Sequence, residues 1–171
     1  RLVGTDDEFN VRVDLDRNKT EVGSITDISF FFRYETGIAE VGGIVPIVVA
    51  GTIQPPILAL TSVDFTPPGS QTLEFGTAAF DSGPQLLTFR VTNAGQSRML
   101  WFRSDTLPPW LTVSDPVSVT ANSAQTVSVV LDRATLTPGE IVSHVLEITG
   151  TTFDGAIIGT TEVLINATVT P

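Results

Sequence analysis

The sequence predicts an all-β protein made of antiparallel β-sandwiches in tandem, the first of them represented only by its C-terminal half. Three observations lead to this prediction. Apolar and polar residues alternate with a period of two, turn-forming residues recur at short intervals, and one stretch of the chain is repeated. No stretch has the apolar spacing of a convincing amphipathic helix.

The alternation is clearest in "FNVRVDL", "QTVSVVL" and "TEVLINATV". Between such runs lie "TPPGS", "FDSGPQ", "TNAGQ", "TLPPW", "TLTPGE" and "TFDG", whose glycine, proline, asparagine and aspartate residues favour turns. Many short strands with regular turns are typical of a β-sandwich. In chain order, we expect strands at 9–15, 27–34, 44–53, 72–75, 86–92, 99–103, 110–113, 125–131, 142–149 and 161–169.

The repeat joins two distant stretches, "VRVDLDRNKTEVGSI" from Val11 and "VSVVLDRATLTPGEI" from Val127. An offset of 116 residues aligns positions 11–55 with positions 127–171 without a gap. Eleven of these 45 positions are identical, whereas average composition would give about three. The identities are Val11/Val127, Val13/Val129, Leu15/Leu131, Asp16/Asp132, Arg17/Arg133, Gly23/Gly139, Ile25/Ile141, Thr36/Thr152, Gly43/Gly159, Thr52/Thr168 and Pro55/Pro171.

The repeat predicts the domain boundary. If Pro55 and Pro171 are equivalent ends, residues 56–171 form a complete sandwich and residues 1–55 match only the second half of one. We therefore expect the chain to begin within a domain whose first half would lie before Arg1. The repeated Asp-Arg pairs predict the same structural contact at a strand end in each repeat.

Within the complete unit, three stretches carry a resemblance to a known family: "LEFGTAAFDSGPQLLTFRVTNAGQSRMLWF", "LPPWLTVSD" and "VSVVLDRATLTPGEIVSHVLEITG". Together they resemble the BACON-like family of immunoglobulin-type sandwiches, and they also look like the broader set of bacterial and phage surface domains. The resemblance runs from Leu73 to about Gly150; its departures are "PVSVTANSAQ", which lacks the usual glycine, and the long lead-in from Ile57 to Gln71. It implies an immunoglobulin-like fold with Trp110 in the core.

Composition excludes several classes of protein. The chain is 42% hydrophobic and 16% charged, which is not a disordered composition. Its net charge of −10 and its singly scattered lysines and arginines argue against binding to nucleic acid or to an anionic membrane. The longest apolar run, "GGIVPIVVAG", is too short to insert across a membrane. No cysteine is present, so disulfides, thiolate chemistry and cysteine-bound zinc are excluded.

The sequence does not predict an enzyme. Its one histidine, His144, has no cysteine to activate, and no Gly-x-Ser-x-Gly motif is present. We expect His144 on the surface or in an edge strand. No cofactor is expected either, with calcium as the alternative: Asp6, Asp7 and Glu8 could supply oxygen ligands from a loop. Asp14 and Asp16 are weaker candidates because they share one face of a strand.

Aromatic residues raise two further possibilities. Trp101 and Trp110 flank a proline-rich turn, and an exposed Trp101 is a candidate contact for a sugar ring. The run "ISFFFRY" has three consecutive phenylalanines, so at least one must point away from a one-sided core. We expect that run to pack on both faces or to lie under a neighbouring subunit.

Two sequons make Asn18 and Asn166 candidate glycosylation sites, although they do not occupy equivalent positions in the repeats. The sequence as a whole favours a non-enzymatic structural module of an extracellular assembly, such as a cell-surface protein, filament or phage fibre. The expected partner is another copy of the repeat, bound through strand addition. The alternative is a module that binds carbohydrate or a host surface.

Overall fold

The computed structural model describes residues 23–35, 42–103 and 106–171, and most of these residues lie in strands. No helix among them is long and apolar enough to cross a membrane. The elements are β1 (Gly23–Glu35), β2 (Gly42–Ile53), β3 (Leu58–Thr61), β4 (Thr72–Ala79), β5 (Gln85–Asn93), β6 (Met99–Arg103), β7 (Leu111–Val113), β8 (Ser118–Val119), β9 (Ser123–Leu131), the 3₁₀ turn η1 (Arg133–Thr135), β10 (Ile141–Thr151) and β11 (Ile157–Thr170).

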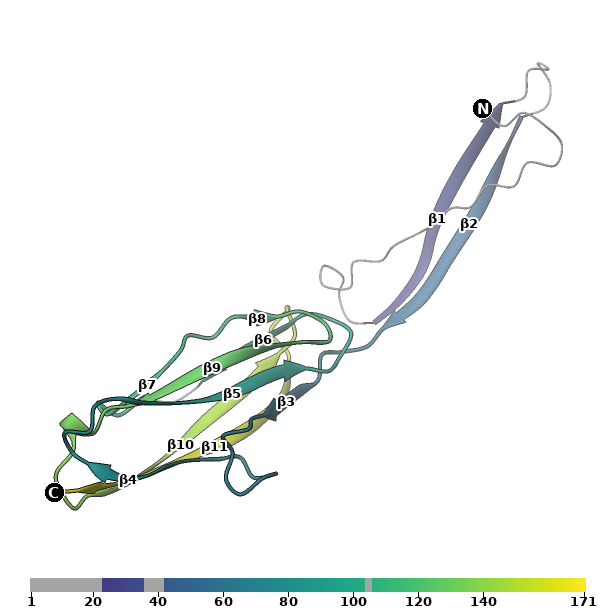
Figure 1. The fold of residues 1–171 in the computed structure, drawn as a ribbon. Coiled ribbons are helices and arrows are strands. Elements are labelled where there is room, and N and C mark those ends of the chain that lie inside the picture. Colours follow the sequence, from purple (N-terminus) through teal and green to yellow (C-terminus); the bar gives the residue numbers. More distant parts are fainter. Residues whose placement is uncertain (1–22, 36–41, 104–105) are drawn as a thin grey trace.

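Strands β3 to β11 form two facing sheets (Figure 1). One sheet has the order β4-β11-β10-β6-β8 and the other the order β3-β5-β9-β7. The pairing of β4 with β11 is parallel, and the other pairings within these two sheets are antiparallel. Consecutive strands cross repeatedly from one sheet to the other, so the two layers are held together by the chain itself.

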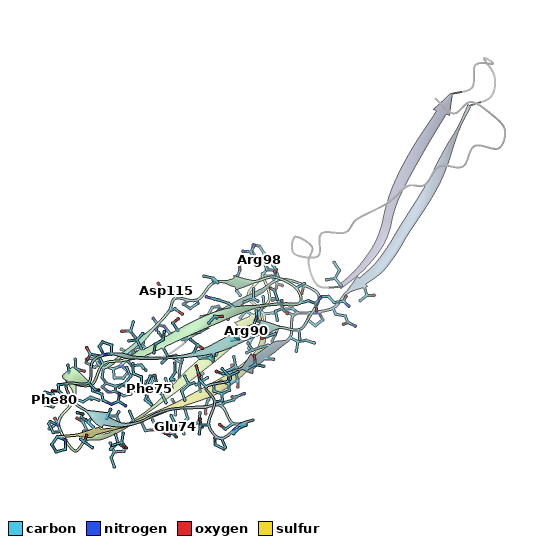
Figure 2. All side chains as sticks on the ribbon, viewed as in Figure 1. Glu74, Phe75, Phe80, Arg90, Arg98 and Asp115 are labelled. Carbon is cyan, nitrogen blue, oxygen red and sulfur yellow. The ribbon has the colours of Figure 1, made fainter. Side chains whose placement is uncertain are left out.

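The core lies between the two sheets and follows from the alternation in the sequence. In β9, Val127, Val129 and Leu131 are fully buried, whereas the residues between them are half-buried. In β10, which belongs to the opposite sheet, Leu146 and Ile148 are fully buried. Because successive side chains of a strand point to opposite faces, a period of two places one apolar row of each strand inside the sandwich. Figure 2 shows side chains between the two layers of the sandwich.

The strands expected between residues 27 and 169 are all present, most of them one to four residues longer than expected. The expected strand at 9–15 lies outside the described residues. Three elements were not expected: β3, β8 and η1. β3 follows two prolines as a short run of three apolar residues and a threonine, and β8 has only two residues. Neither is long enough to show a period of two.

The remaining two strands, β1 and β2, form a separate two-stranded antiparallel sheet. Figure 1 shows this hairpin extending from the end of the sandwich at which β3 begins, while the C-terminus lies at the opposite end. Only four residues, 54–57, join β2 to β3. The hairpin is therefore a distinct element attached to the sandwich by a short connection.

Candidate assembly interface

Over seven successive residue pairs, the β1–β2 hairpin has the same strand register as the β10–β11 hairpin of the sandwich. Seven successive pairs run from Ile28↔Val49 to Tyr34↔Gly43 in the first hairpin. Adding the repeat offset of 116 to each residue gives the pairs from His144↔Ile165 to Gly150↔Gly159, and the second hairpin has these same seven pairs. The offset follows from residue identities, and the backbone pairing agrees with it over these seven pairs.

The residues at equivalent positions also agree in character where β10 and β11 are buried. Leu146, Ile148, Val163 and Ile165 are each 0% exposed in the core of the sandwich. At an offset of 116 their counterparts are Phe30, Phe32, Ile47 and Val49, which are all apolar. In the sandwich, these positions of β10 and β11 face the sheet that contains β5 and β9.

The two hairpins differ in what lies along their edges. β11 pairs on its other side with β4, and β10 pairs on its other side with β6. Among the described strands, β1 and β2 pair only with each other. A strand that lacks a neighbour presents a row of backbone donors and acceptors to which another strand can add. The hairpin thus has the register of a sandwich interior and the edges of an incomplete sheet.

The Asp132-Arg133 pair lies at the end of β9. The Asp132 carboxylate accepts a hydrogen bond from the Ala134 amide at 3.0 Å and so caps η1. Arg133 is 1% exposed and donates to the carbonyls of Phe75 and Gly76, at 2.9 and 3.2 Å. It also donates to Gln85 Oε1 at 2.9 Å. Burial lowers the pKa of Arg133 from its usual value.

Because β9 and β4 belong to different sheets, Arg133 ties the two layers of the sandwich together. The repeat predicts a structural contact for this pair at a strand end, and Asp132 and Arg133 make such contacts directly after β9. Their equivalents Asp16 and Arg17 lie outside the described residues, so the shared geometry of the two pairs stays a prediction.

The tryptophan and histidine residues lie in or against the core. Trp101 is 2% exposed and donates from Nε1 to Gln125 Oε1 at 2.6 Å. Sugar stacking needs an exposed ring face, which a buried Trp101 does not offer, and this corrects the expectation of a ligand contact. Trp110 is partly buried against the core and meets His144 edge-to-face, with ring centroids 6.2 Å apart. His144 lies in β10, a central strand and not an edge strand.

The other candidate residues divide into described and undescribed ones. Asn166 lies in β11, and its Nδ2, the atom that would carry a glycan, donates to Glu74 Oε1 at 2.7 Å. Asn18, and the calcium candidates Asp6, Asp7 and Glu8, lie outside the described residues. Within the described part of the chain, no group of three or more histidine or acidic residues is arranged to hold a metal ion.

The sequence "TNAGQ" predicts a turn, but it does not predict that the Asn93 side chain makes five hydrogen bonds. Asn93 is fully buried at the end of β5. Its Oδ1 accepts from the amides of Ile57 and Gly95, at 3.2 and 3.0 Å. Its Nδ2 donates to the carbonyls of three residues, Ser97, Val119 and Thr120, at 2.7 to 3.2 Å. The signal in the sequence was an asparagine two residues before a glycine.

Comparison with solved structures identifies the fold. The PapD-like domain 7 (ASH/PapD-like) of human CEP192 aligns with 66% of this chain and 84% of its own, at 10% identity and a TM-score of 0.50. The fold is an immunoglobulin-like β-sandwich. Among other similar structures are AggA of Escherichia coli, the major subunit of aggregative adherence fimbriae type I, and the Vibrio cholerae protease VesB.

AggA aligns with 70% of this chain and 98% of its own, at 17% identity and a TM-score of 0.44. VesB aligns with 66% of this chain and 32% of its own, at 17% identity and a TM-score of 0.45. No family model and no curated protein matches the sequence. The alignment with the CEP192 domain confirms the immunoglobulin-like part of the resemblance at the level of the fold, and the BACON-like part stays a prediction.

Proposed function

We propose that this protein is a non-enzymatic structural module of an extracellular assembly, in which strand contacts with another copy complete the β1–β2 hairpin. The observation that carries the proposal is the register shared by β1–β2 and β10–β11 at the repeat offset. A hairpin of this kind belongs in the middle of a sheet and under a second sheet. Among the described strands, it has neither partner.

The contacts of Arg133 support the same proposal. In the sandwich this arginine takes two of its three acceptors from β4 in the opposite sheet. By the repeat, Arg17 holds the equivalent sequence position. A buried arginine needs acceptors, because an unpaired buried charge is costly. Arg17 would find them on a strand of the β4 type, and an incoming strand along the edge of β2 would supply it.

The composition fits a location outside the cell. The chain is strand-rich and acidic, and its net negative charge would keep a module soluble when it is exposed to solvent on a cell surface, filament or virion. Strand addition between copies uses one contact in a head-to-tail manner. Repeated addition builds a filament when the rotation between successive copies does not close into a ring.

The experiment is a mass measurement on the purified chain over a range of concentrations, combined with amide exchange of residues 42–53. We expect masses above that of the monomer, rising with concentration, and slower exchange of the β2 amides as the mass rises. A chain that stays monomeric at high concentration, with hairpin amides protected by its own contacts, would overturn the proposal.

The alternative function is a module that binds carbohydrate or a host surface. Its support in the structure is Phe153, which is 69% exposed in the turn between β10 and β11. Exposed aromatic rings suit stacking on sugars. The guanidinium of Arg98 lies 5.4 Å from the centre of this ring and already covers one face. Binding to a glycan array that is lost in a Phe153→Ala variant would favour this alternative.

A further inference from the structure

The connection between the hairpin and the sandwich is held by the turn after β5. We propose that residues 93–97 form a seat for the end of a preceding unit, which fixes the unit in line with the sandwich. The proposal rests on the proposed function in one respect, since it treats the hairpin as part of a second unit. The occupant of the seat is the segment 53–57 that follows β2.

Two hydrogen bonds join Ile57, the last residue of this segment, to the turn after β5. The Ile57 amide donates to Asn93 Oδ1 at 3.2 Å, and the Ala94 amide donates to the Ile57 carbonyl at 2.9 Å. Asn93 is itself fixed, because its amide nitrogen donates to three carbonyls. The orientation of its side chain is unambiguous, since Oδ1 faces two amide donors and Nδ2 faces only acceptors. Asn93 thus joins the connection, its own turn and the loop after β8.

Close packing adds to the hydrogen bonds. Ile53, the last residue of β2, is 1% exposed, and Pro56 is buried. Gly95 lies directly against the connection: a Cβ at this position would be 2.5 Å from Pro56 Cα and 2.7 Å from the Ile57 nitrogen. Only a residue without a side chain allows this approach. The turn therefore packs directly against the backbone of residues 55–57, which a flexible linker without fixed contacts would not do.

The arrangement has a consequence for a tandem array. The repeat makes Pro55 equivalent to Pro171. The connection at Pro56 and the C-terminus lie at opposite ends of the sandwich (Figure 1). Units joined through such a seat would follow one another end to end. The result is a stiff rod, because two prolines and a four-residue connection leave little freedom at each joint.

The test uses the full chain with Gly95→Ala and, as a matched control, Gly159→Ala, where a Cβ would meet nothing within 4 Å. Amide exchange of Ile57 and Ala94 reports the seat, and nitrogen relaxation compares the tumbling of hairpin and sandwich at a concentration where the chain is monomeric. We expect Gly95→Ala to accelerate exchange at both amides by at least tenfold and to uncouple the tumbling. The control should leave both unchanged. Unchanged exchange and tumbling in Gly95→Ala would overturn the proposal.

A second variant covers the case in which Gly95→Ala unfolds the sandwich. Four residues, Gly-Ser-Gly-Ser, inserted between Gln54 and Pro55 leave the turn and its hydrogen bonds intact. The hairpin should then tumble independently while the Ile57 amide stays protected. Equal tumbling of the hairpin in the insertion variant and in the unmodified chain would show that the seat does not hold it. Exchange and tumbling do not depend on self-association, whereas the mass measurement does. The seat can therefore be contradicted while the proposed function is supported, and the proposed function can be contradicted while the seat is supported.

Discussion

Two buried polar side chains hold this sandwich at points where the apolar core cannot. Asn93 satisfies backbone groups of turns that lie at one end of the sandwich. Arg133 satisfies carbonyls of β4 from the opposite sheet. Without these two side chains, their backbone partners would be buried and unpaired. Each buried donor or acceptor left without a partner costs about 1 to 3 kcal/mol of stability. Such residues specify which loop meets which strand.

At Arg133 we predict that substitution by methionine lowers the free energy of unfolding by about 2 to 4 kcal/mol, because it leaves the acceptors of β4 unpaired. Arg133→Lys should recover part of the loss, since an ammonium group cannot reach several acceptors in a fork. Arg90→Met, at an exposed position of β5, is the control and should change stability by less than about 0.5 kcal/mol. Urea unfolding measures all three, and an equal effect of the Arg133→Met and Arg90→Met changes would contradict the prediction.

At the scale of the element, the turn between β10 and β11 depends on one exposed carboxylate. The hydroxyl of Thr152 donates to Asp154, and this bond, helped by the Asp154 and Ala156 amides, lowers the pKa of Asp154 below its usual value of 3.8. A carboxyl whose pKa is depressed by folding adds stability that is fully present above the unfolded pKa. That stability is lost as the pH falls through the folded pKa.

We therefore expect the stability difference between the unmodified chain and Asp154→Asn to be constant above about pH 5 and to shrink below about pH 4. Thermal unfolding at a series of pH values measures it. Thr152→Val removes the main donor, so the pH dependence of the difference should be smaller in that background. A difference that stays constant down to pH 2 would show that the bond to Thr152 does not influence the titration.

Most of the strands could be predicted from the sequence, for a physical reason that β9 illustrates. Val127, Val129 and Leu131 occupy every second position of β9, so the period of two predicts that they share one face, and all three are buried. β3 could not be predicted, because a short apolar run after two prolines has no period. Trp101 could not be placed either: whether a tryptophan is buried depends on which partner reaches its indole nitrogen, and Gln125 lies 24 residues away.

The candidate interface was predictable in part. The repeat offset and the expected strands at 27–34 and 44–53 follow from residue identities and alternation. The seat at Asn93 and Gly95 could not be predicted in this way. It depends on the close approach of Pro56 to Gly95 and on the hydrogen bond from Ile57, which lies 36 residues before Asn93. Long-range contacts of this kind leave no local pattern in the chain.

At the scale of the whole molecule, the net charge of −10 opposes the assembly that the hairpin favours. Copies of the chain repel one another. Salt shortens the range of this repulsion, from about 30 Å at 0.01 M to about 10 Å at 0.1 M. We predict that self-association strengthens as sodium chloride rises from about 0.01 M to about 0.5 M. Sedimentation at fixed protein concentration measures it. Weaker association at high salt would indicate contacts carried by opposite charges in place of strands.

The central claim is that β1–β2 and β10–β11 are equivalent halves of the same kind of unit. A chimera tests it most directly: residues 1–140 followed by a second copy of residues 25–55, which replaces residues 141–171. In the chimera, the inserted Phe31 takes the position of half-buried Glu147 and the inserted Phe32 that of fully buried Ile148. Two matched variants, Phe31→Glu and Phe32→Glu in the inserted copy, then probe the two faces of one strand.

The measurement is thermal unfolding of the chimera and of both variants, followed by circular dichroism. We predict one cooperative transition for the sandwich of the chimera, its retention in the Phe31→Glu variant, and its loss in the Phe32→Glu variant, because a buried unpaired carboxylate costs about 3 kcal/mol or more. A chimera without a cooperative transition, or two variants that unfold alike, would contradict the equivalence of the two hairpins.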